Sequence, residues 1–377
     1  MPFMEISKIE IFTGTVHFLA PFKISLGTSE FSEDVIVKIY ADDGIFGLGE
    51  AAPAARITGE SQETILGASV SIAQNLIGND TDSMNALLDT IQSTILRNSA
   101  AKAAFDTALY DLVSKMAGKP LYRYLGGYRE RVQSDVTIGI MPSAEAVTKA
   151  QRLLNMGVGI VKMKVGDKID DGLERVKKVR ETVGQKTKIF IDANQAWEPK
   201  YAISAIRKFE KYDIDLVEQP VKASDVDGLS FVRKNVDVPV MADEAVHTPE
   251  DAIRIVKSDA ADMINIKLMK AGGIYNATKI AAISEAAGLK NMVGCMMEGA
   301  VGIAAGIHFA LSSKNVTFVD LDSDIDMKNT LTGMRMLPFV EGFREPLDGA
   351  GIGIDDVDSN EVKLFRTIKR RSSSRSF

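Results

Sequence analysis

The stretch IVKMKVGDKIDDGLERVKKVRETVGQKTKIFIDAN, residues 160–194, decides the fold. It begins and ends with a short β-rich run, IVKMKV and KIFIDAN, and an amphipathic helical pattern lies between the two runs. The same unit recurs about every 25 residues from about residue 131 to about residue 325. A strand that alternates with a helix in this way predicts a parallel sheet covered by helices.

Eight β-rich runs lie in this part of the chain, with seven helical stretches between them. The runs are VTIGI, IVKMKV, KIFIDAN, DLVEQP, VPVMADE, MINIKLM, NMVGCMME and VTFVDLD. This rhythm predicts a closed (β/α) barrel, although a doubly wound open sheet uses the same units. Thr248 and Pro249 support the register, because they supply an N-cap and a proline at the first position of a helix.

Residues 1–125 follow a different pattern. The alternating runs SKIEIFTGTVHF and DVIVKIYADDGIFGLGE predict antiparallel strands near the N-terminus. Residues from about 61 to about 117 then have the pattern of helices that end in glycine. We therefore expect an α+β capping domain at residues 1–125 and a barrel domain at residues 126–345, with the C-terminal segment 346–377 packed near the capping domain.

The composition excludes several classes of protein. A net charge of -6 argues against a nucleic-acid partner, since phosphate binding needs a basic face. There is no run of about 18 apolar residues and no visible signal peptide, so we expect no membrane partner. A single cysteine, Cys295, agrees with a cytoplasmic protein. The end RTIKRRSSSRSF, residues 366–377, predicts a disordered tail, with a functional basic arm as the alternative.

Polar residues stand at the end of nearly every predicted barrel strand. In strand order they are Lys162 and Lys164, Asp192 and Asn194, Glu218, Asp243 and Glu244, Asn265 and Lys267, Glu298, and Asp320 and Asp322. The C-terminal strand ends of a parallel barrel form one mouth, and side chains two residues apart on a strand point the same way. One such residue alone would usually be a solvated loop edge. Because the pattern recurs over seven strands, it indicates a composite site.

Three consecutive strands end in the carboxylates Asp192, Glu218 and Asp243. Such an arc would repel itself unless a divalent cation lay within it, and ligands that are all oxygen favour Mg²⁺ over zinc. The chain has only three histidines, which disfavours a histidine-based zinc site or a catalytic triad.

Several of these stretches resemble one family. VKMKVG, IDANQAW, VEQP, MADE, NIKLMKAGG and GCMMEG, in this order, resemble the enolase superfamily in its muconate-cycloisomerase-like subgroup. The resemblance covers nearly the whole chain. It implies a (β/α)₇β barrel of the TIM type, a Mg²⁺ ion bound by Asp192, Glu218 and Asp243, and an acid–base role for Lys164 and Lys267.

Barrel geometry gives the two lysines a specific role. Strands two and six stand opposite each other in a barrel of eight, so Lys164 and Lys267 would face one carbon from its two sides. A 1,1-proton transfer, which racemises or epimerises that carbon, requires this arrangement. Mg²⁺ would neutralise the enediolate that forms when the α-proton leaves. A neighbouring cation such as Lys162 would lower the pKa of a lysine base.

The acids of strand eight, Asp320 and Asp322, would lie across the mouth from the arc. With one metal accounted for, we expect them to bind an ammonium group of the substrate, and a dipeptide fits the span. This D-x-D is similar to that of the dipeptide epimerases in the subgroup. We therefore predict a Mg²⁺-dependent dipeptide epimerase that inverts the Cα of the C-terminal residue. Further substrate-binding residues would be Lys162, Asn194 and Glu298. A helix cap or a solvated acidic turn is the alternative for the two acids.

The loop PFKISLGTS, residues 21–29, departs from the family pattern. In the branch that acts on alanyl-glutamate, the similar loop carries an arginine where Gly27 stands here. We therefore expect a hydrophobic or basic residue at the C-terminus of the dipeptide. Lys23 could replace the arginine only if the loop turned it inward, and Glu30 would suit a cationic side chain.

Two other interpretations stay open. Within the subgroup, an N-acylamino-acid racemase or an o-succinylbenzoate synthase would need the same lysines and metal but no pair of acids on strand eight. From another class, a non-catalytic sensor would keep the pocket without turnover. The sequence leaves the dipeptide and the oligomeric state undecided, and a homo-oligomer is compatible with it.

Overall fold

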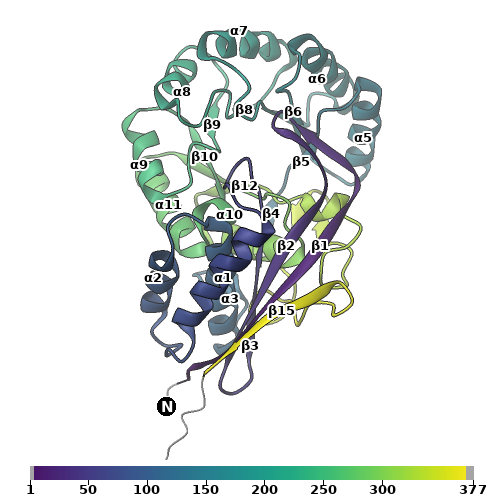
Figure 1. The fold of residues 1–377 in the computed structure, drawn as a ribbon. Helices are drawn as coiled ribbons and strands as arrows, with labels where there is room; N and C mark the ends of the chain where they lie inside the picture. Colours follow the sequence, from purple (N-terminus) through teal and green to yellow (C-terminus); the bar gives the residue numbers. More distant parts are fainter. Residues whose placement is uncertain (1–3, 371–377) are drawn as a thin grey trace, which may run out of the picture.

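The computed structural model describes residues 4–370, and Figure 1 shows its ribbon. The prediction of a disordered tail is wrong for residues 366–369, because they belong to the strand β15 (Val362–Lys369). Residues 371–377, the rest of that predicted tail, lie outside the described residues.

The larger sheet has eight parallel strands that neighbour one another in the order of the sequence. They are β5 (Val136–Ile138), β6 (Ile160–Lys164), β7 (Lys188–Asp192), β8 (Leu216–Glu218), β9 (Val240–Ala242), β10 (Met263–Lys267), β11 (Lys290–Gly294) and β12 (Val316–Asp320). A parallel bridge from Ser134, just before β5, to Val319 of β12 joins the two ends. Because the strand order never reverses and the ends meet, the sheet is the predicted closed barrel and not a doubly wound open sheet.

Helices form the outer ring of the barrel (Figure 1). They are α5 (Ser143–Asn155), α6 (Ile169–Val183), α7 (Pro199–Phe209), α8 (Val226–Arg233), α9 (Pro249–Lys257), α11 (Ile274–Ala286) and α12 (Ala300–Ser312). A helix of four buried residues, α10 (Leu268–Ala271), follows β10 directly. The predicted start of α9 is confirmed: the Thr248 side chain accepts a hydrogen bond from the Asp251 N–H, and Pro249 occupies the first turn. A 3₁₀ turn, η1 (Glu210–Tyr212), follows α7.

The inward face of the barrel changes from apolar to charged along the strands. One buried cluster lies near the strand starts and consists of Ile160, Phe190, Leu216, Met241, Met263 and Met292. Two residues further along their strands stand Lys162, Asp192 and Glu218. Since side chains two apart on a strand share a face, the alternation of the sequence puts the charged layer above the apolar one, at the C-terminal strand ends.

The N-terminal domain is an antiparallel sheet in the order β15-β1-β2-β3, with β1 (Ile6–Ile24), β2 (Gly27–Ala41) and β3 (Phe46–Ala51). Three helices accompany it: α1 (Gln62–Leu76), α2 (Met84–Thr94) and α3 (Ser99–Met116). Gly49 lets β3 approach α3, because a Cβ there would lie 1.8 Å from the Ala104 carbonyl oxygen. The C-terminal strand β15 returns to this domain and pairs with β1.

The remaining elements are short. They are α4 (Leu121–Tyr124), β4 (Val132–Gln133), the 3₁₀ turn η2 (Ser323–Asp326), β13 (Phe339–Val340) and β14 (Phe343–Arg344). The strands β4, β14 and β13 form a third, antiparallel sheet. The long β1–β2 hairpin rises from the N-terminal sheet to the barrel (Figure 1). At its tip, Ser25 Oγ donates to the backbone oxygen of Asn194 (3.0 Å). Below the tip, the Ile140 N–H donates to the Lys23 carbonyl (2.9 Å). The hairpin therefore covers part of the barrel mouth.

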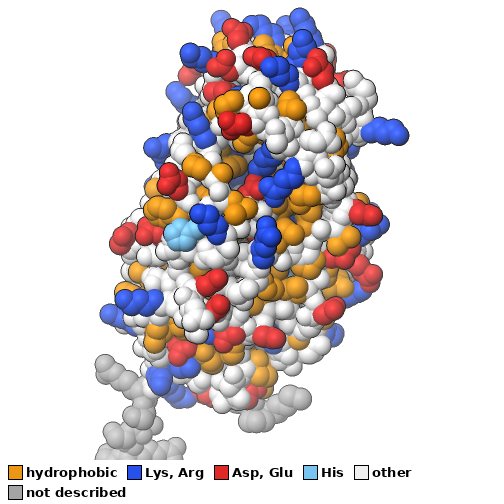
Figure 2. Space-filling view, turned by 90° about the vertical axis from the view of Figure 1, so that its right-hand side faces the viewer, with side chains coloured by type: hydrophobic (Ala, Val, Ile, Leu, Met, Phe, Trp, Pro, Cys, Tyr) orange, Lys and Arg blue, Asp and Glu red, His pale blue; other side chains and the backbone are white. Residues whose placement is uncertain are grey.

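The face of the molecule seen in Figure 2 carries charged side chains of both signs. In Figure 2, acidic and basic side chains are interspersed over the visible face, with hydrophobic side chains between them. Within residues 4–370, no helix is both long enough and apolar enough to cross a membrane.

Candidate active site

Three carboxylates from neighbouring strands meet at the barrel mouth. Asp192 ends β7, Glu218 ends β8, and Asp243 follows directly after β9. Asp192 and Glu218 are aligned partners in the β7–β8 ladder, so both side chains leave the sheet at the same height. All three side chains are buried, and one oxygen from each lies within 4.8 Å of the others. The structure thus brings together the three acids that the sequence singled out.

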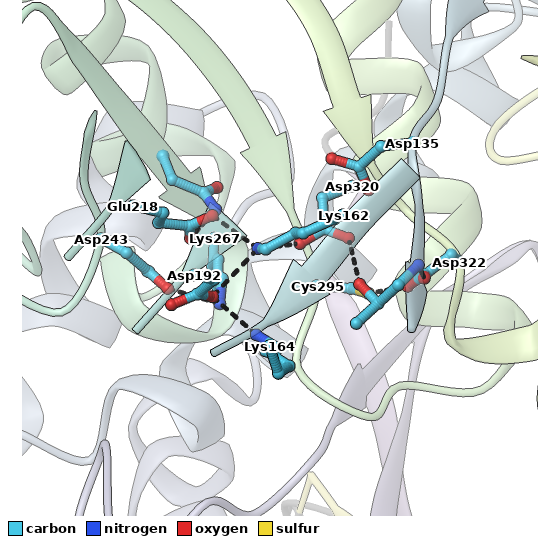
Figure 3. Close-up of polar contacts among 12 residues, drawn as sticks. Asp135, Lys162, Lys164, Asp192, Glu218, Asp243, Lys267, Cys295, Asp320 and Asp322 are labelled. Atoms are coloured by element: carbon cyan, nitrogen blue, oxygen red, sulfur yellow. Dashed lines mark hydrogen bonds and ion pairs between the residues drawn. The ribbon is translucent and has the colours of Figure 1, made fainter. Parts of the chain in front are cut away.

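Lysine ammonium groups lie against these acids (Figure 3). Lys164 Nζ is 2.6 Å from Asp192 Oδ2. Lys267 Nζ is 2.8 Å from Asp243 Oδ2. Both amines lie at the mouth, and they come from β6 and β10, which are four strands apart in the sheet of eight.

A third predicted lysine, Lys162, is fully buried in the middle of the site. Its Nζ lies 2.6 Å from Glu218 Oε2 and 3.3 Å from Asp192 Oδ2. On its other side it lies 2.8 Å from Asp320 Oδ2. Lys162 therefore links the carboxylate arc to the acids of β12, instead of lining a cavity.

Sequence reasoning missed Lys270, which lies in α10 and is buried. Its Nζ is 2.6 Å from Asp243 Oδ1. Burial alone would raise the pKa of Asp243, but the charges of Lys267 and Lys270 outweigh it and hold that pKa well below its usual range. Burial and the charge of Asp192 raise the pKa of Glu218. Lysine charges therefore lower the pKa of one acid of the arc, whereas burial and a neighbouring carboxylate raise the pKa of another.

The donor set fits a hard divalent cation. Glu218 Oε2 and Asp243 Oδ1 accept no hydrogen bond within the described part of the chain, although each lies 2.6 Å from an ammonium nitrogen. Buried oxygens without hydrogen bonds are costly, and three carboxylates within reach of one point are the ligands that Mg²⁺ and Ca²⁺ prefer. The acidic groups are positioned to hold a metal ion.

The two predicted acids of β12 lie across the mouth from the arc. Asp320 ends β12, and Asp322 follows it. The Thr137 N–H donates to Asp322 Oδ2 (2.7 Å), and the Thr137 hydroxyl donates to Asp320 Oδ1 (3.4 Å). Burial and the charge of Asp320 raise the pKa of Asp322 to about 6.

A third acid in this group, Asp135, is fully buried beside them and was not anticipated. Neither of its carboxyl oxygens accepts a hydrogen bond from the described residues. Burial and the charge of Asp320 raise the pKa of Asp135 well above its usual range. Burial and the neighbouring Asp320 carboxylate therefore favour the protonated form of Asp135.

Two cavities open from the site. The first, the Asp320 cavity, has a volume of about 450 Å³ and is lined by Asp320, Asp322 and residues of β1 and α5. The second, the Gly27 cavity, has a volume of about 320 Å³ and is lined by Gly27, Asn194 and the loop of residues 53–57. Lys164 and Lys267 line both cavities. The two amines therefore stand where the cavities meet.

One predicted residue, Glu298, is not brought to either cavity. It is buried, and its Oε2 accepts a hydrogen bond from the Met296 N–H (2.6 Å). Its Cβ packs near Gly302 of α12. Asn194, in contrast, lines the Gly27 cavity and donates to Asp192 Oδ2 (3.3 Å) and Glu244 Oε1 (3.2 Å).

The sequence matches two family profiles. One, described as "Mandelate racemase / muconate lactonizing enzyme, N-terminal domain", covers residues 8–126. The other, described as "Enolase C-terminal domain-like", covers residues 145–359.

Three relatives illustrate the range of similar proteins. An L-Ala-D/L-Glu epimerase of Bacillus subtilis is 43% identical over 86% of this chain and 90% of its own. An N-succinyl-L-Arg/Lys racemase of Bacillus cereus is 34% identical over 97% of this chain and 100% of its own. The solved structure of a dipeptide epimerase from Enterococcus faecalis, complexed with Mg and the dipeptide L-Leu-L-Tyr, is 38% identical. It has a TM-score of 0.89 and covers 93% of this chain and 99% of its own.

Proposed function

The chain belongs to the enolase superfamily, and we propose that it is a Mg²⁺-dependent dipeptide epimerase that inverts the Cα of the C-terminal residue. The similar curated proteins are epimerases and racemases, which are isomerases. One observation carries the proposal: two lysine amines from strands four apart meet where two cavities join, and a pair of acids lines one of those cavities.

Lys164 and Lys267 would move the proton. In one direction of the reaction, one neutral amine removes the α-proton from its side, and the ammonium group of the other lysine delivers a proton to the opposite side. In the reverse direction the two lysines exchange roles. Such positioned acid–base groups typically accelerate proton transfer by about 10²- to 10⁴-fold each.

Asp192, Glu218 and Asp243 would hold the metal ion. When bound, Mg²⁺ supplies positive charge that neutralises the negative charge developing on the substrate carboxylate as the α-proton leaves. The Mg found with a dipeptide in the relative from Enterococcus faecalis supports this choice of ion. Lys270 would keep Asp243 ionised and oriented, since it contacts the second oxygen of that carboxylate.

Asp320 and Asp322 would bind the α-ammonium group of the dipeptide. Both line the larger cavity, and a carboxylate that accepts from an ammonium group forms a charge-assisted hydrogen bond. An extended dipeptide spans about 7 Å between its termini, by the reach of about 3.5 Å per residue. Lys162 neutralises part of the charge of Asp320. Asp322 would therefore contribute more than Asp320 to binding of the α-ammonium group.

Deuterium exchange tests the proposal. The protein is incubated with Mg²⁺ and a dipeptide library in D₂O, and mass spectrometry follows deuterium at the α-carbon of the C-terminal residue. We expect exchange and inversion for a subset of dipeptides. Turnover of N-succinyl amino acids without any dipeptide exchange would favour the N-acylamino-acid racemase instead. No exchange with either class would favour the non-catalytic sensor.

A further inference from the structure

Arg56 lies in the loop between β3 and α1, and its guanidinium group covers Gly27 at the start of β2. A Cβ built on Gly27 would be 2.4 Å from Nη1 of Arg56 and 3.0 Å from its Cζ. The φ of Gly27 is +150°, which residues with a Cβ rarely adopt. The glycine therefore leaves room for the guanidinium group, and the two residues form one wall of the Gly27 cavity.

The Arg56 side chain has no partner of opposite charge. It forms neither an ion pair nor a hydrogen bond with any residue in the range 4–370. Arg152, which lines the Asp320 cavity, does have such a partner, since its Nη1 lies 3.4 Å from Asp326 Oδ1. The Arg56 guanidinium group is thus free to bind an anion.

The charges of the two cavities differ. The charged residues that line the Gly27 cavity, as far as the structure is described, are Arg56, Lys164 and Lys267, and all three are positive. Among residues 4–370, the Asp320 cavity has four acids, Glu145, Asp320, Asp322 and Asp326. Besides Lys164 and Lys267, its basic residues are Lys149 and Arg152, and both form ion pairs with Asp326. A ligand that spans both cavities would therefore place a cation in the Asp320 cavity and an anion in the Gly27 cavity.

The sequence offered two residues, Lys23 and Glu30, that could select the side chain of the dipeptide's C-terminal residue, and neither lines either cavity. Phe22 and Ile24 line the Gly27 cavity, and the side chain of Lys23, which lies between them on β1, points to the other face of the strand. The sequence predicted a preference for a basic C-terminal residue as one possibility, but no acid in the described part of the chain lines the Gly27 cavity to bind such a side chain.

The substituents of the reacting carbon assign the cavities. With the α-carbon of a bound dipeptide between Lys164 and Lys267, its carboxylate would point to the arc, and its nitrogen would lead to the N-terminal residue in the Asp320 cavity. The proton would point to a lysine. The remaining substituent, the side chain of the C-terminal residue, would then enter the Gly27 cavity, which the lysines also line.

We infer that Arg56 determines substrate specificity and selects dipeptides with an acidic C-terminal residue, glutamate or aspartate. This inference rests on the proposed function. The side-chain methylene groups would pack on the apolar wall of Ile24, Leu26 and Ile57, and the carboxylate would accept hydrogen bonds from the guanidinium group of Arg56.

The experiment compares L-Ala-L-Glu with L-Ala-L-Gln, which has the same shape without the charge, and with L-Ala-L-Leu and L-Ala-L-Lys. Exchange at the α-carbon in D₂O gives kcat/KM for each. For the wild-type protein we expect L-Ala-L-Glu to exceed L-Ala-L-Gln by about 10- to 100-fold, the usual value of a charged hydrogen bond. Arg56→Gln should bring that ratio close to one, and Arg56→Lys should give an intermediate ratio, because lysine keeps the charge without the planar fork.

Arg335→Gln is the matched control. Like Arg56, Arg335 is exposed, but it lines neither cavity. Its substitution should leave every ratio of kcat/KM between two dipeptides unchanged. The melting temperature of each variant shows whether it is folded. A wild-type preference for L-Ala-L-Leu or L-Ala-L-Lys, or an equal loss of Glu and Gln turnover in Arg56→Gln, would overturn the inference and leave the epimerase intact. Absence of exchange with every dipeptide would overturn both.

Discussion

Buried carboxylates occur in two regions of this molecule, and their partners differ. At the barrel mouth, Asp192, Glu218 and Asp243 face the ammonium groups of lysine side chains. At the interface between the N-terminal domain and the barrel, Glu50 and Asp106 face backbone N–H groups at the first turns of barrel helices. Both sets are almost completely shielded from solvent.

The carboxylates of the interface acids, Glu50 and Asp106, accept hydrogen bonds from backbone N–H groups, whose positions are fixed by the helices. Glu50 accepts from the Gly299 N–H (2.9 Å) and the Gly302 N–H (2.7 Å) at the start of α12. Asp106 accepts from the Ile274 N–H (2.6 Å) and the Tyr275 N–H (3.2 Å) at the start of α11. Free N–H groups and the helix dipole favour an acid at this end of a helix. These contacts join the two domains.

The difference shows that burial of an acid does not by itself mark a functional site. Backbone N–H groups cannot move away, whereas a lysine side chain can exchange its partner for a substrate or an ion. At the mouth, oxygens of Glu218 and Asp243 remain without hydrogen bonds within the described chain. The arrangement at the mouth is thus open to a ligand, and that at the interface is closed.

The largest expected effect is on proton transfer. Replacing Lys267 by Met should lower kcat for epimerisation by about 10²- to 10⁴-fold, because one face of the α-carbon loses its acid–base group. Lys164 remains on its own face, so α-deuterium exchange should persist from one stereoisomer only. The measurement is exchange in D₂O from each stereoisomer separately, with Asp106→Asn as the control. Equal exchange from both stereoisomers would contradict the opposed lysines.

The next effect is on metal binding. Glu218→Gln should weaken Mg²⁺ binding by about 100-fold or more, since loss of a ligand exceeds the 10- to 100-fold typical of groups around a metal site. Titration calorimetry measures the Kd. Asp106→Asn, an acid-to-amide change at the interface, should leave that Kd unchanged. An equal loss in both variants would remove the distinction between the two regions.

A smaller effect separates the two sides of the mouth. Asp322→Asn should lower kcat/KM for dipeptides by about 10- to 100-fold, through loss of a charge-assisted hydrogen bond to the ammonium group. It should leave the Kd for Mg²⁺ close to that of the wild-type protein. If Mg²⁺ binding were lost and dipeptide turnover were kept, Asp322 would belong to a metal site instead.

The smallest effect is on stability at the interface. Burial raises the pKa of Asp106 to about 8, against an ordinary value of 3.8. At a pH between 3.8 and about 8, Asp106 holds a proton in the folded protein and releases it in the unfolded chain. The contribution of Asp106 to stability is therefore full below pH 3.8 and is lost as the pH rises through about 8. Relative to Asp106→Asn, the wild-type protein should lose about 1 to 2 kcal/mol of unfolding free energy between about pH 6.5 and pH 8.

Denaturant unfolding of both proteins at each pH measures this difference, and comparison with the variant removes the contribution of other titrating groups. The Mg²⁺ affinity of Asp106→Asn serves as the control. A constant stability difference across the pH range would mean that Asp106 keeps an ordinary pKa despite its burial.

The strand rhythm made much of this site predictable. Lys164, Asp192 and Lys267 end strands, and parallel strands of a barrel necessarily bring such ends together. Asp135 could not be found this way because it precedes its strand. It meets the end of β12 only because the closing strands are staggered, with Ser134 bridged to Val319. Lys270 was hidden because it lies in a short helix after β10.

Arg56 lies at the limit of sequence reasoning. The sequence indicated only that Gly27 has no side chain, and this suggested that a positive group was missing. The fold brings the loop after β3 over the β1–β2 hairpin, so that the guanidinium group of Arg56 covers Gly27. Contacts between segments 29 residues apart, without a common period, depend on how the loops pack.

The sequence by itself determined the barrel, the order of its strands and the layer of charged residues at the mouth, because side-chain alternation is a local property of each strand. Only the tertiary structure decided which charges pair, which acids face the cavities and which cap helices of the other domain. Those outcomes depend on strand stagger and on domain packing, and both arise from contacts between residues far apart in the chain.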